Sequence, residues 1–230
     1  MMYRDRTDAG RQLGARLLGE LPWSRDEPPV VLAIPRGGVV VGFEVARLLG
    51  ASLDVFVARK LGAPGHEELG IGAIAPGGTR VLDEELVRML GVTPDYIADV
   101  SARELDELER RLHRFRGDRP PLALEGRDVV LVDDGLATGV TARVSLLALR
   151  HNRPRRLIYA APVCSPEGAQ LLSSECDAVV CLAAPQRFRG VGEWYACFDQ
   201  TEDEEVVQLL RQNREALKMP HEESGPSAGF

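Results

Sequence analysis

The sequence is poor in several kinds of residue, and each shortage excludes a class of protein. Its four cysteines form no Cys-x-x-Cys pair and have no histidines at matching spacings, which argues against a zinc site and against a disulfide-built scaffold. We expect these cysteines to be separate thiols in a reducing cytosol. The most apolar stretch, residues 30–46, is interrupted by Arg36 and Glu44, so no run is long enough to span a membrane.

Basic residues are also in the minority, with 28 Lys and Arg against 35 Asp and Glu and a net charge of −7. Proteins that bind nucleic acid generally present a basic surface, so we expect no nucleic-acid partner. A local basic pocket for a small anion is still compatible with this charge. The first residues are not followed by an apolar segment of the secretory type, and we expect a cytoplasmic protein with no membrane partner.

The composition that remains is that of a globular chain, with 44% hydrophobic and 27% charged residues. Short apolar runs alternate with segments of helical periodicity. The expected strands are residues 30–34, 52–58, 128–132, 157–163 and 178–183. The expected helices are residues 5–21, 39–49, 83–91, 94–116, 140–151, 166–175 and 203–217. This alternation predicts an α/β fold with a mostly parallel central sheet flanked by helices.

The chain is expected to form a single domain over residues 1–217, with its core at about residues 28–184. The two chain ends, residues 1–25 and 185–200, would together form a hood over one edge of the sheet. The tail, residues 219–230, is polar and contains proline, glycine and serine, so we expect it to be disordered.

The most informative segment is residues 129–141, in which a buried strand ends in two adjacent carboxylates, Asp133 and Asp134. The carboxyl ends of strands in open α/β sheets face the ligand crevice. Gly135 and Gly139 allow a sharp turn and a close approach of the backbone to a ligand. Backbone N–H groups then converge where a helix begins, which favours an anion. The predicted phosphate cradle is Ala137, Thr138, Gly139, Val140 and Thr141.

Two carboxylates beside a bound phosphate would repel it unless the ligand also needs them. Carboxylates accept hydrogen bonds from a vicinal diol such as that of ribose, and Mg²⁺ takes oxygen ligands. A phosphorylated ribose accompanied by a metal ion would therefore satisfy the whole segment.

This segment closely resembles the binding motif for phosphoribosyl pyrophosphate (PRPP) in the type I phosphoribosyltransferases. That motif has four apolar residues, two acids, two small or apolar residues and a Thr/Gly/Thr loop. A second stretch, residues 33–42, is similar to the pyrophosphate loop of the family, with an Arg-Gly-Gly like that of the xanthine-guanine branch. Arg36 there offers a forked cation for phosphate oxygens, and Gly37 and Gly38 offer open N–H groups.

A third element follows the second expected strand. The resemblance implies that a basic residue in this region contacts pyrophosphate, so Arg59 and Lys60 are candidates, the alternative being a solvated strand end. Residues 60–79 are rich in glycine and proline and predict a long mobile loop or hairpin. The resemblance identifies residues 62–78 as a lid that closes over the site.

The resemblance implies an enzyme, a pentosyl-type glycosyltransferase of nucleotide metabolism. It would transfer ribose 5-phosphate from PRPP to a nitrogenous base and release pyrophosphate. Asp133 and Asp134 would be the catalytic residues, holding the ribose diol near the developing positive charge. They would also be ligands of Mg²⁺ brought in with PRPP, while the cradle holds the 5-phosphate.

The partners implied are PRPP and a nucleobase-like acceptor, and a homodimer is compatible with the family. Phe188, Trp194 and Tyr195 could stack on a planar base, or could pack the hood onto the core. Two other activities stay open. One is a non-catalytic sensor of PRPP or nucleotides on the same scaffold, because a fold does not fix a function. The other is a hydrolase of phosphoribosyl compounds.

Overall fold

The structure is a computed structural model, which describes residues 3–24 and 26–218. The expected disordered tail, residues 219–230, and residues 1–2 and 25 of the expected hood lie outside the described residues.

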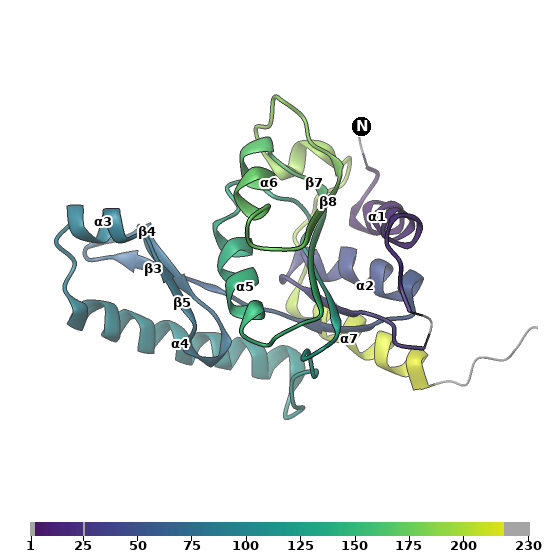
Figure 1. The fold of residues 1–230 in the computed structure, drawn as a ribbon, viewed down its shortest axis with the longest axis horizontal. Coiled ribbons are helices and arrows are strands. Elements are labelled where there is room, and N and C mark those ends of the chain that lie inside the picture. Colours follow the sequence, from purple (N-terminus) through teal and green to yellow (C-terminus); the bar gives the residue numbers. More distant parts are fainter. Residues whose placement is uncertain (1–2, 25, 219–230) are drawn as a thin grey trace, which may run out of the picture.

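The centre of the molecule is a five-stranded sheet in which every neighbouring pair of strands is parallel (Figure 1). The strand order is β2-β1-β6-β7-β8. The strands are β1 (Val30–Ala33), β2 (Ser52–Val55), β6 (Asp128–Val132), β7 (Arg156–Val163) and β8 (Ala178–Ala183). The prediction of an α/β fold with a parallel central sheet is confirmed.

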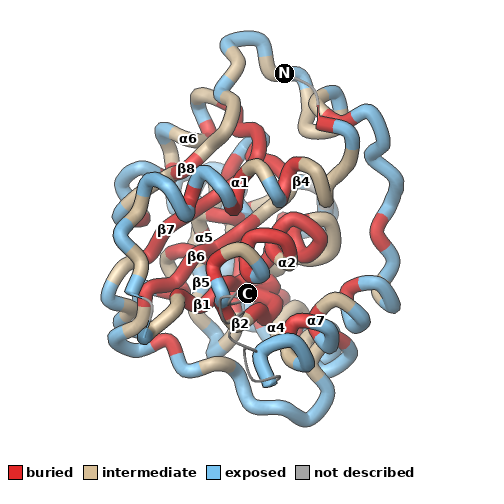
Figure 2. Tube along the Cα trace, turned by 90° about the vertical axis from the view of Figure 1, so that its right-hand side faces the viewer, coloured by how far each residue is buried: buried red, intermediate tan, exposed pale blue. Residues whose placement is uncertain are grey.

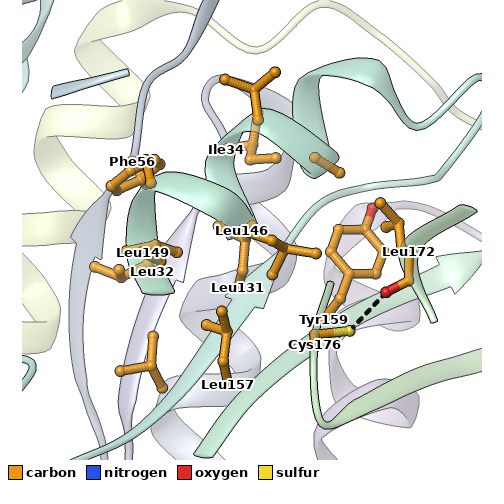
Figure 3. Close-up of a cluster of buried hydrophobic side chains, with 14 of the residues drawn as sticks. Leu32, Ile34, Phe56, Leu131, Leu146, Leu149, Leu157, Tyr159, Leu172 and Cys176 are labelled. Carbon is orange, nitrogen blue, oxygen red and sulfur yellow. Dashed lines mark hydrogen bonds between the residues drawn. The ribbon is translucent and has the colours of Figure 1, made fainter. Parts of the chain in front are cut away.

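Helices cover both faces of this sheet, because alternate residues of each buried strand point to opposite sides. On one face, Val31 and Val130 belong to a cluster with residues of α1 (Arg6–Glu20), α2 (Gly37–Leu49) and α7 (Asp203–Lys218). On the other face, Leu32 and Leu131 pack with residues of α5 (Val140–Arg150) and α6 (Pro166–Leu172), as Figure 3 shows. Figure 2 shows these buried strands and α2 in the interior of the molecule.

The chain changes face between β1 and β6, which are neighbours at the middle of the sheet. The helix after β1, α2, covers one face, and the helix after β6, α5, covers the other. In open α/β sheets such a point leaves a crevice outside the carboxyl ends of the two strands, and ligands bind there. The fold therefore places the loops after β1 and β6 side by side, and we call this junction of the two loops the crevice.

A second, antiparallel sheet projects from the core, and we call residues 59–116 the arm (Figure 1). The arm contains β3 (Arg59–Ala63), β4 (His66–Ile74), a 3-10 turn η1 (Pro76–Gly78), β5 (Arg80–Leu82), α3 (Glu84–Met89) and α4 (Pro94–Arg116). Its strands and helices have a hydrophobic cluster of their own, which includes Leu61, Ile71, Ile97 and Val100. Of the two alternatives predicted for residues 60–79, the structure has a hairpin, and it adds a third strand that was not expected.

The two ends of the chain pair with each other beyond the sheet. The backbone N–H of Tyr3 donates to the carbonyl of Trp194 at 2.7 Å, and the N–H of Ala196 donates to the carbonyl of Tyr3 at 2.8 Å. The Tyr3 hydroxyl donates to the carbonyl of Pro162, near the carboxyl end of β7. Trp194, the partner of Tyr3, is the last residue of the 3-10 turn η2 (Val191–Trp194).

Two of the cysteines are not separate thiols, so that prediction is wrong for them. Cys164 and Cys181 form a disulfide. They lie on and beside the neighbouring parallel strands β7 and β8, whose pairing brings the two Cα atoms to 6.2 Å. Their separation of 17 residues gives no such signal in the sequence. Cys176 is a buried thiol and Cys197 is an exposed one.

Among the helices of the described residues, none is both long and apolar enough to cross a bilayer.

Candidate active site

The two carboxylates of the motif lie directly after β6, at the crevice. The backbone N–H of Asp134 donates to Oδ1 of Asp133 at 2.8 Å, which fixes the first carboxylate against the turn. The N–H of Asp133 donates to the carbonyl of Ala160 in the next strand. The strand pairing thus continues through Asp133, and both side chains lie at the carboxyl end of the central strand.

The loop after β1 lies in contact with these carboxylates. A Cβ atom on Gly38 would be 3.0 Å from Cα of Asp133 and 3.0 Å from the carbonyl oxygen of Val132. A Cβ atom on Gly37 would overlap Oδ2 of Asp134. Only glycine leaves room for this approach, which is why the Arg-Gly-Gly sequence stands here. The structure therefore brings together two motifs that are about a hundred residues apart in the sequence.

The small-residue loop, residues 137–141, leads from the carboxylates into α5. Gly139 is the residue before the helix and has φ of +78°, a backbone conformation that favours glycine. Thr138 and Thr141 are exposed, so their hydroxyls and the free N–H groups at the start of α5 are accessible to a ligand. This geometry fits an anion at the start of the helix.

The crevice also contains a cation that the motifs did not predict. Nε of Arg6, the first residue of α1, donates to Oδ2 of Asp134 at 2.7 Å. Its Nη1 donates to the carbonyl of Asp199, and its guanidinium lies 3.9 Å from the centre of the Phe198 ring. No local pattern marks Arg6 in the sequence, because its partner Asp134 is 128 residues away.

The surroundings shift the proton affinity of both carboxylates. Burial raises the pKa of Asp133 well above its ordinary value, and the neighbouring carboxylate of Asp134 adds to the increase. Burial also raises the pKa of Asp134, but the guanidinium of Arg6 opposes this increase. A cation or a hydrogen-bond donor placed between the two carboxylates would stabilise their charged forms.

Comparison with known proteins decides the family. The model of the "Phosphoribosyl transferase domain" matches residues 6–192, which include the loops after β1 and β6. The chain belongs to this family. Its members include the transferases whose PRPP motif the segment after β6 resembles.

Three relatives are similar over most of the chain. Two Mycobacterium tuberculosis proteins, MT0597 of strain CDC 1551 / Oshkosh and Rv0571c of strain ATCC 25618 / H37Rv, are provisionally named as phosphoribosyl transferases. Each is 44% identical over 209 residues, which are 91% of this chain and 46% of the relative. The chain thus spans about half the length of these curated relatives. The crystal structure of TT1426 from Thermus thermophilus is 44% identical, covers 92% of this chain and 99% of its own, and superposes with a TM-score of 0.79.

The three basic side chains predicted for pyrophosphate lie in two places in this family member. Arg36 stands at the crevice, where its Nη1 is 3.6 Å from Oδ1 of Asp203. Arg59 pairs with Glu104 of α4 at 2.7 Å, and Arg59 and Lys60 line a cavity of about 270 Å³ on the arm. Arg36 thus precedes the two glycines that contact the carboxylates, while its own guanidinium faces Asp203 of α7, and the other two cations lie on a separate surface.

The three aromatic residues predicted for a base also differ from one another. Tyr195 is only 5% exposed, with the rings of Tyr3 and Phe198 centred 5.5 and 4.9 Å away. Its hydroxyl donates to the carbonyl of Asp134 at 2.6 Å, and burial raises its pKa, so it remains a donor at neutral pH. Phe188 and Trp194 are partly exposed. Tyr195 is therefore a buried residue that fixes the turn after β6 through its hydrogen bond to Asp134.

The donor set of the crevice sets a condition on any metal ion. Among the residues that the structure describes, no group of three His, Cys, Asp or Glu side chains is arranged to hold an ion. Mg²⁺ usually binds proteins through one or two carboxylates and takes its other ligands from water and substrate phosphates. Asp133 and Asp134 fit that pattern, provided that the ligand supplies the remaining oxygens.

Proposed function

We propose that the protein transfers the 5-phosphoribosyl group from PRPP to a nitrogenous base, with release of pyrophosphate. The observation that carries this proposal is the contact between the Arg-Gly-Gly loop after β1 and the Asp133–Asp134 pair after β6. A phosphate cradle, two carboxylates and a cationic loop within one crevice match the three parts of PRPP: its 5-phosphate, its ribose diol and its pyrophosphate.

Each part of the crevice has a role in this proposal. Residues 137–141 bind the 5-phosphate through the N–H groups at the start of α5 and the threonine hydroxyls. Asp133 and Asp134 accept hydrogen bonds from the ribose diol and stabilise positive charge that develops on the ribosyl ring. Arg36 and the backbone of Gly37 and Gly38 bind the pyrophosphate.

Mg²⁺ would be held by Asp133 and Asp134 together with oxygens of PRPP, and it would supply positive charge that stabilises the departing pyrophosphate. Arg6 donates to Oδ2 of Asp134 and the N–H of Asp134 donates to Oδ1 of Asp133, so Oδ1 of Asp134 and Oδ2 of Asp133 are left for ligands. Arg59 and Lys60 would reach the pyrophosphate only when the arm approaches the crevice. Phe188 and Trp194 are the proposed aromatic contacts of the base.

The test is release of pyrophosphate from PRPP and Mg²⁺ in the presence of a panel of purine and pyrimidine bases. Release that depends on one class of base, and that falls in Asp134→Asn, supports the proposal. The amide of that variant keeps the size of the carboxylate but cannot stabilise the ribosyl cation, so kcat should fall while binding of PRPP persists. Release without any base would indicate a hydrolase, and binding without turnover on any base would indicate a sensor.

A further inference from the structure

The loop that forms the phosphate cradle is hydrogen-bonded to Ser165, the residue that precedes α6. Ser165 precedes α6, and its Oγ donates to the carbonyl of Ala137 at 2.5 Å. The same oxygen accepts from the N–H of Gly168 at 2.9 Å, as the cap of the helix. The N–H of Ser165 donates to the carbonyl of Leu136 at 2.8 Å. Two successive carbonyls of the loop after β6 are therefore bound to one serine.

We propose that Ser165 is a positioning residue that turns the N–H groups of the cradle toward the 5-phosphate. The inference rests on the proposed function, because it assumes that residues 137–141 bind a phosphate. Ser165 itself would not touch the ligand; it acts through the Ala137 carbonyl.

The planarity of the peptide bond provides the mechanism. The carbonyl of Ala137 and the N–H of Thr138 belong to one trans peptide, so they point in opposite directions. With its carbonyl fixed toward α6, this peptide directs the Thr138 N–H away from α6, to the exposed side of the loop. A reversed peptide would instead present a carbonyl oxygen to the phosphate and repel it.

The packing around this contact makes the serine hard to replace. A Cβ atom on Gly168 would lie 2.6 Å from the Ala137 carbonyl oxygen and 2.8 Å from Oγ of Ser165, so the carbonyl sits in a notch that only glycine leaves. Ala137 is an exposed residue, but its carbonyl points to Ser165, which is 6% exposed, and to the buried Gly168. Removal of the hydroxyl takes away the hydrogen bond that fixes the direction of this carbonyl, so the peptide can rotate toward solvent.

The experiment measures the affinity of wild type and Ser165→Ala for three probes: inorganic phosphate, ribose 5-phosphate and pyrophosphate. We expect the variant to bind the first two about tenfold more weakly, the scale of one lost hydrogen bond to a charged group, and pyrophosphate unchanged. With a working acceptor, the KM for PRPP should rise by a similar factor with little change in kcat. Ser165→Thr keeps the hydroxyl and should recover most of the affinity.

Two further variants complete the test. Ser173→Ala is the matched control, because the Ser173 hydroxyl is exposed and donates only to Gln170 at the end of the same helix; it should behave as wild type. Gly168→Ala keeps the Ser165 hydroxyl but displaces the Ala137 carbonyl, and it should show the same selective loss if Ser165→Ala does not fold. Unchanged phosphate affinity in the folded Ser165→Ala, or an equal loss for pyrophosphate, would overturn the inference alone. Failure of wild type to bind either monophosphate would overturn the proposed function with it.

Discussion

At the scale of single residues, the crevice depends on a glycine that has no room for a side chain. Gly37 lies so close to Asp134 and Arg6 that a methyl group there would overlap Oδ2 of Asp134 and lie 2.6 Å from Nε of Arg6. The ion pair between these two side chains therefore limits the space available to the Arg-Gly-Gly loop after β1. A larger residue in the loop should therefore displace the Asp134 carboxylate, and so weaken ligand binding, at a smaller cost to the stability of the fold.

Gly37→Ala should weaken PRPP binding by at least about tenfold and destabilise the protein by roughly 1–3 kcal/mol, the cost of overpacking a close contact. Gly19→Ala is the control, since no atom lies within 4 Å of the added methyl group in α1, and it should stabilise the helix by about 0.5–1 kcal/mol. Urea unfolding and calorimetry measure both quantities. Normal PRPP binding in Gly37→Ala would mean that the loop does not hold the ligand as proposed.

Arg36→Ala should weaken PRPP binding far more than ribose 5-phosphate binding, because Arg36 is assigned to the pyrophosphate alone. The loss of a charge-assisted contact should cost on the order of 1.5–3 kcal/mol. Titration of both ligands into the variant checks this. Equal losses for the two ligands would place Arg36 elsewhere in the site.

Asp128, the first residue of β6, has a structural role that can be tested separately from the role of the crevice. Asp128, at the other end of the strand, has a side chain that is 3% exposed and pairs with Arg155 at 2.9 Å and Arg156 at 2.6 Å. Burial alone would raise the pKa of Asp128, but the hydrogen bonds from Arg156 and Arg155 outweigh it and lower the pKa to about 2.

Asp128→Asn should therefore lower the free energy of unfolding at pH 7 by about 2 kcal/mol. Because the folded-state pKa is below the unfolded value, the stabilisation is complete above the unfolded pKa, near 4, and is lost as pH falls toward 2. The difference between wild type and variant should narrow over that window in urea unfolding. A difference that stays constant with pH would show that the charge of Asp128 is not what stabilises the strand.

At the scale of elements, the arm is a packed unit. Its buried side chains Leu61, Ile71 and Ile97 form a cluster of their own, while Ala73 and Ala75 join the cluster of the core. Phe115, near the end of α4, packs into the cluster on the opposite face of the central sheet. The arm is thus anchored to the core at its base and packed internally along its length.

We therefore expect the strands of the arm to be protected from hydrogen exchange in the free protein, unlike the mobile lid that the family resemblance implied for residues 62–78. Fast exchange should be confined to the turn between β3 and β4, at residues 64–65. Addition of PRPP and Mg²⁺ should add protection where the arm faces the core, in a cavity of about 470 Å³ that is lined by Gly70 and Gly72 of the arm and Val140 of α5. Fast exchange throughout residues 59–74 of the free protein would instead support a flexible lid.

The elements that the sequence predicted well are those with a strong local pattern. The apolar run before Asp133 and the glycine-rich turn after it specify a strand, a loop and a helix within thirteen residues. The arm was harder because Gly62, Gly70 and Gly72 interrupt the alternation of its strands. These glycines are there for packing: a Cβ on Gly62 would meet the backbone of Glu67 at 2.7 Å, and one on Gly72 would overlap the carbonyl of Val81.

At the scale of the whole molecule, the features that local sequence could not predict are those that join distant segments. The pairing of Tyr3 with residues 194–196, the pair of Arg6 with Asp134 and the order of the strands all depend on tertiary structure. The resemblance nevertheless assigned the two motifs to one ligand, and the structure places their strands, β1 and β6, next to each other. The switch of helices between the faces of the sheet brings the loops after β1 and β6 together, and Arg6 pairs with Asp134 at this junction.

Binding of PRPP and its metal ion at this crevice can be measured by calorimetric titration of PRPP into the wild-type protein, once with Mg²⁺ and once with EDTA. Asp133 and Asp134 face a polyanion in the proposed complex, so they need a divalent cation between them and the ligand. We predict saturable binding at one site per chain with Mg²⁺, and binding at least about tenfold weaker in EDTA, a difference of about 1.4 kcal/mol. No binding under either condition, or equal affinity in both, would contradict the assignment of this crevice to PRPP and its metal ion.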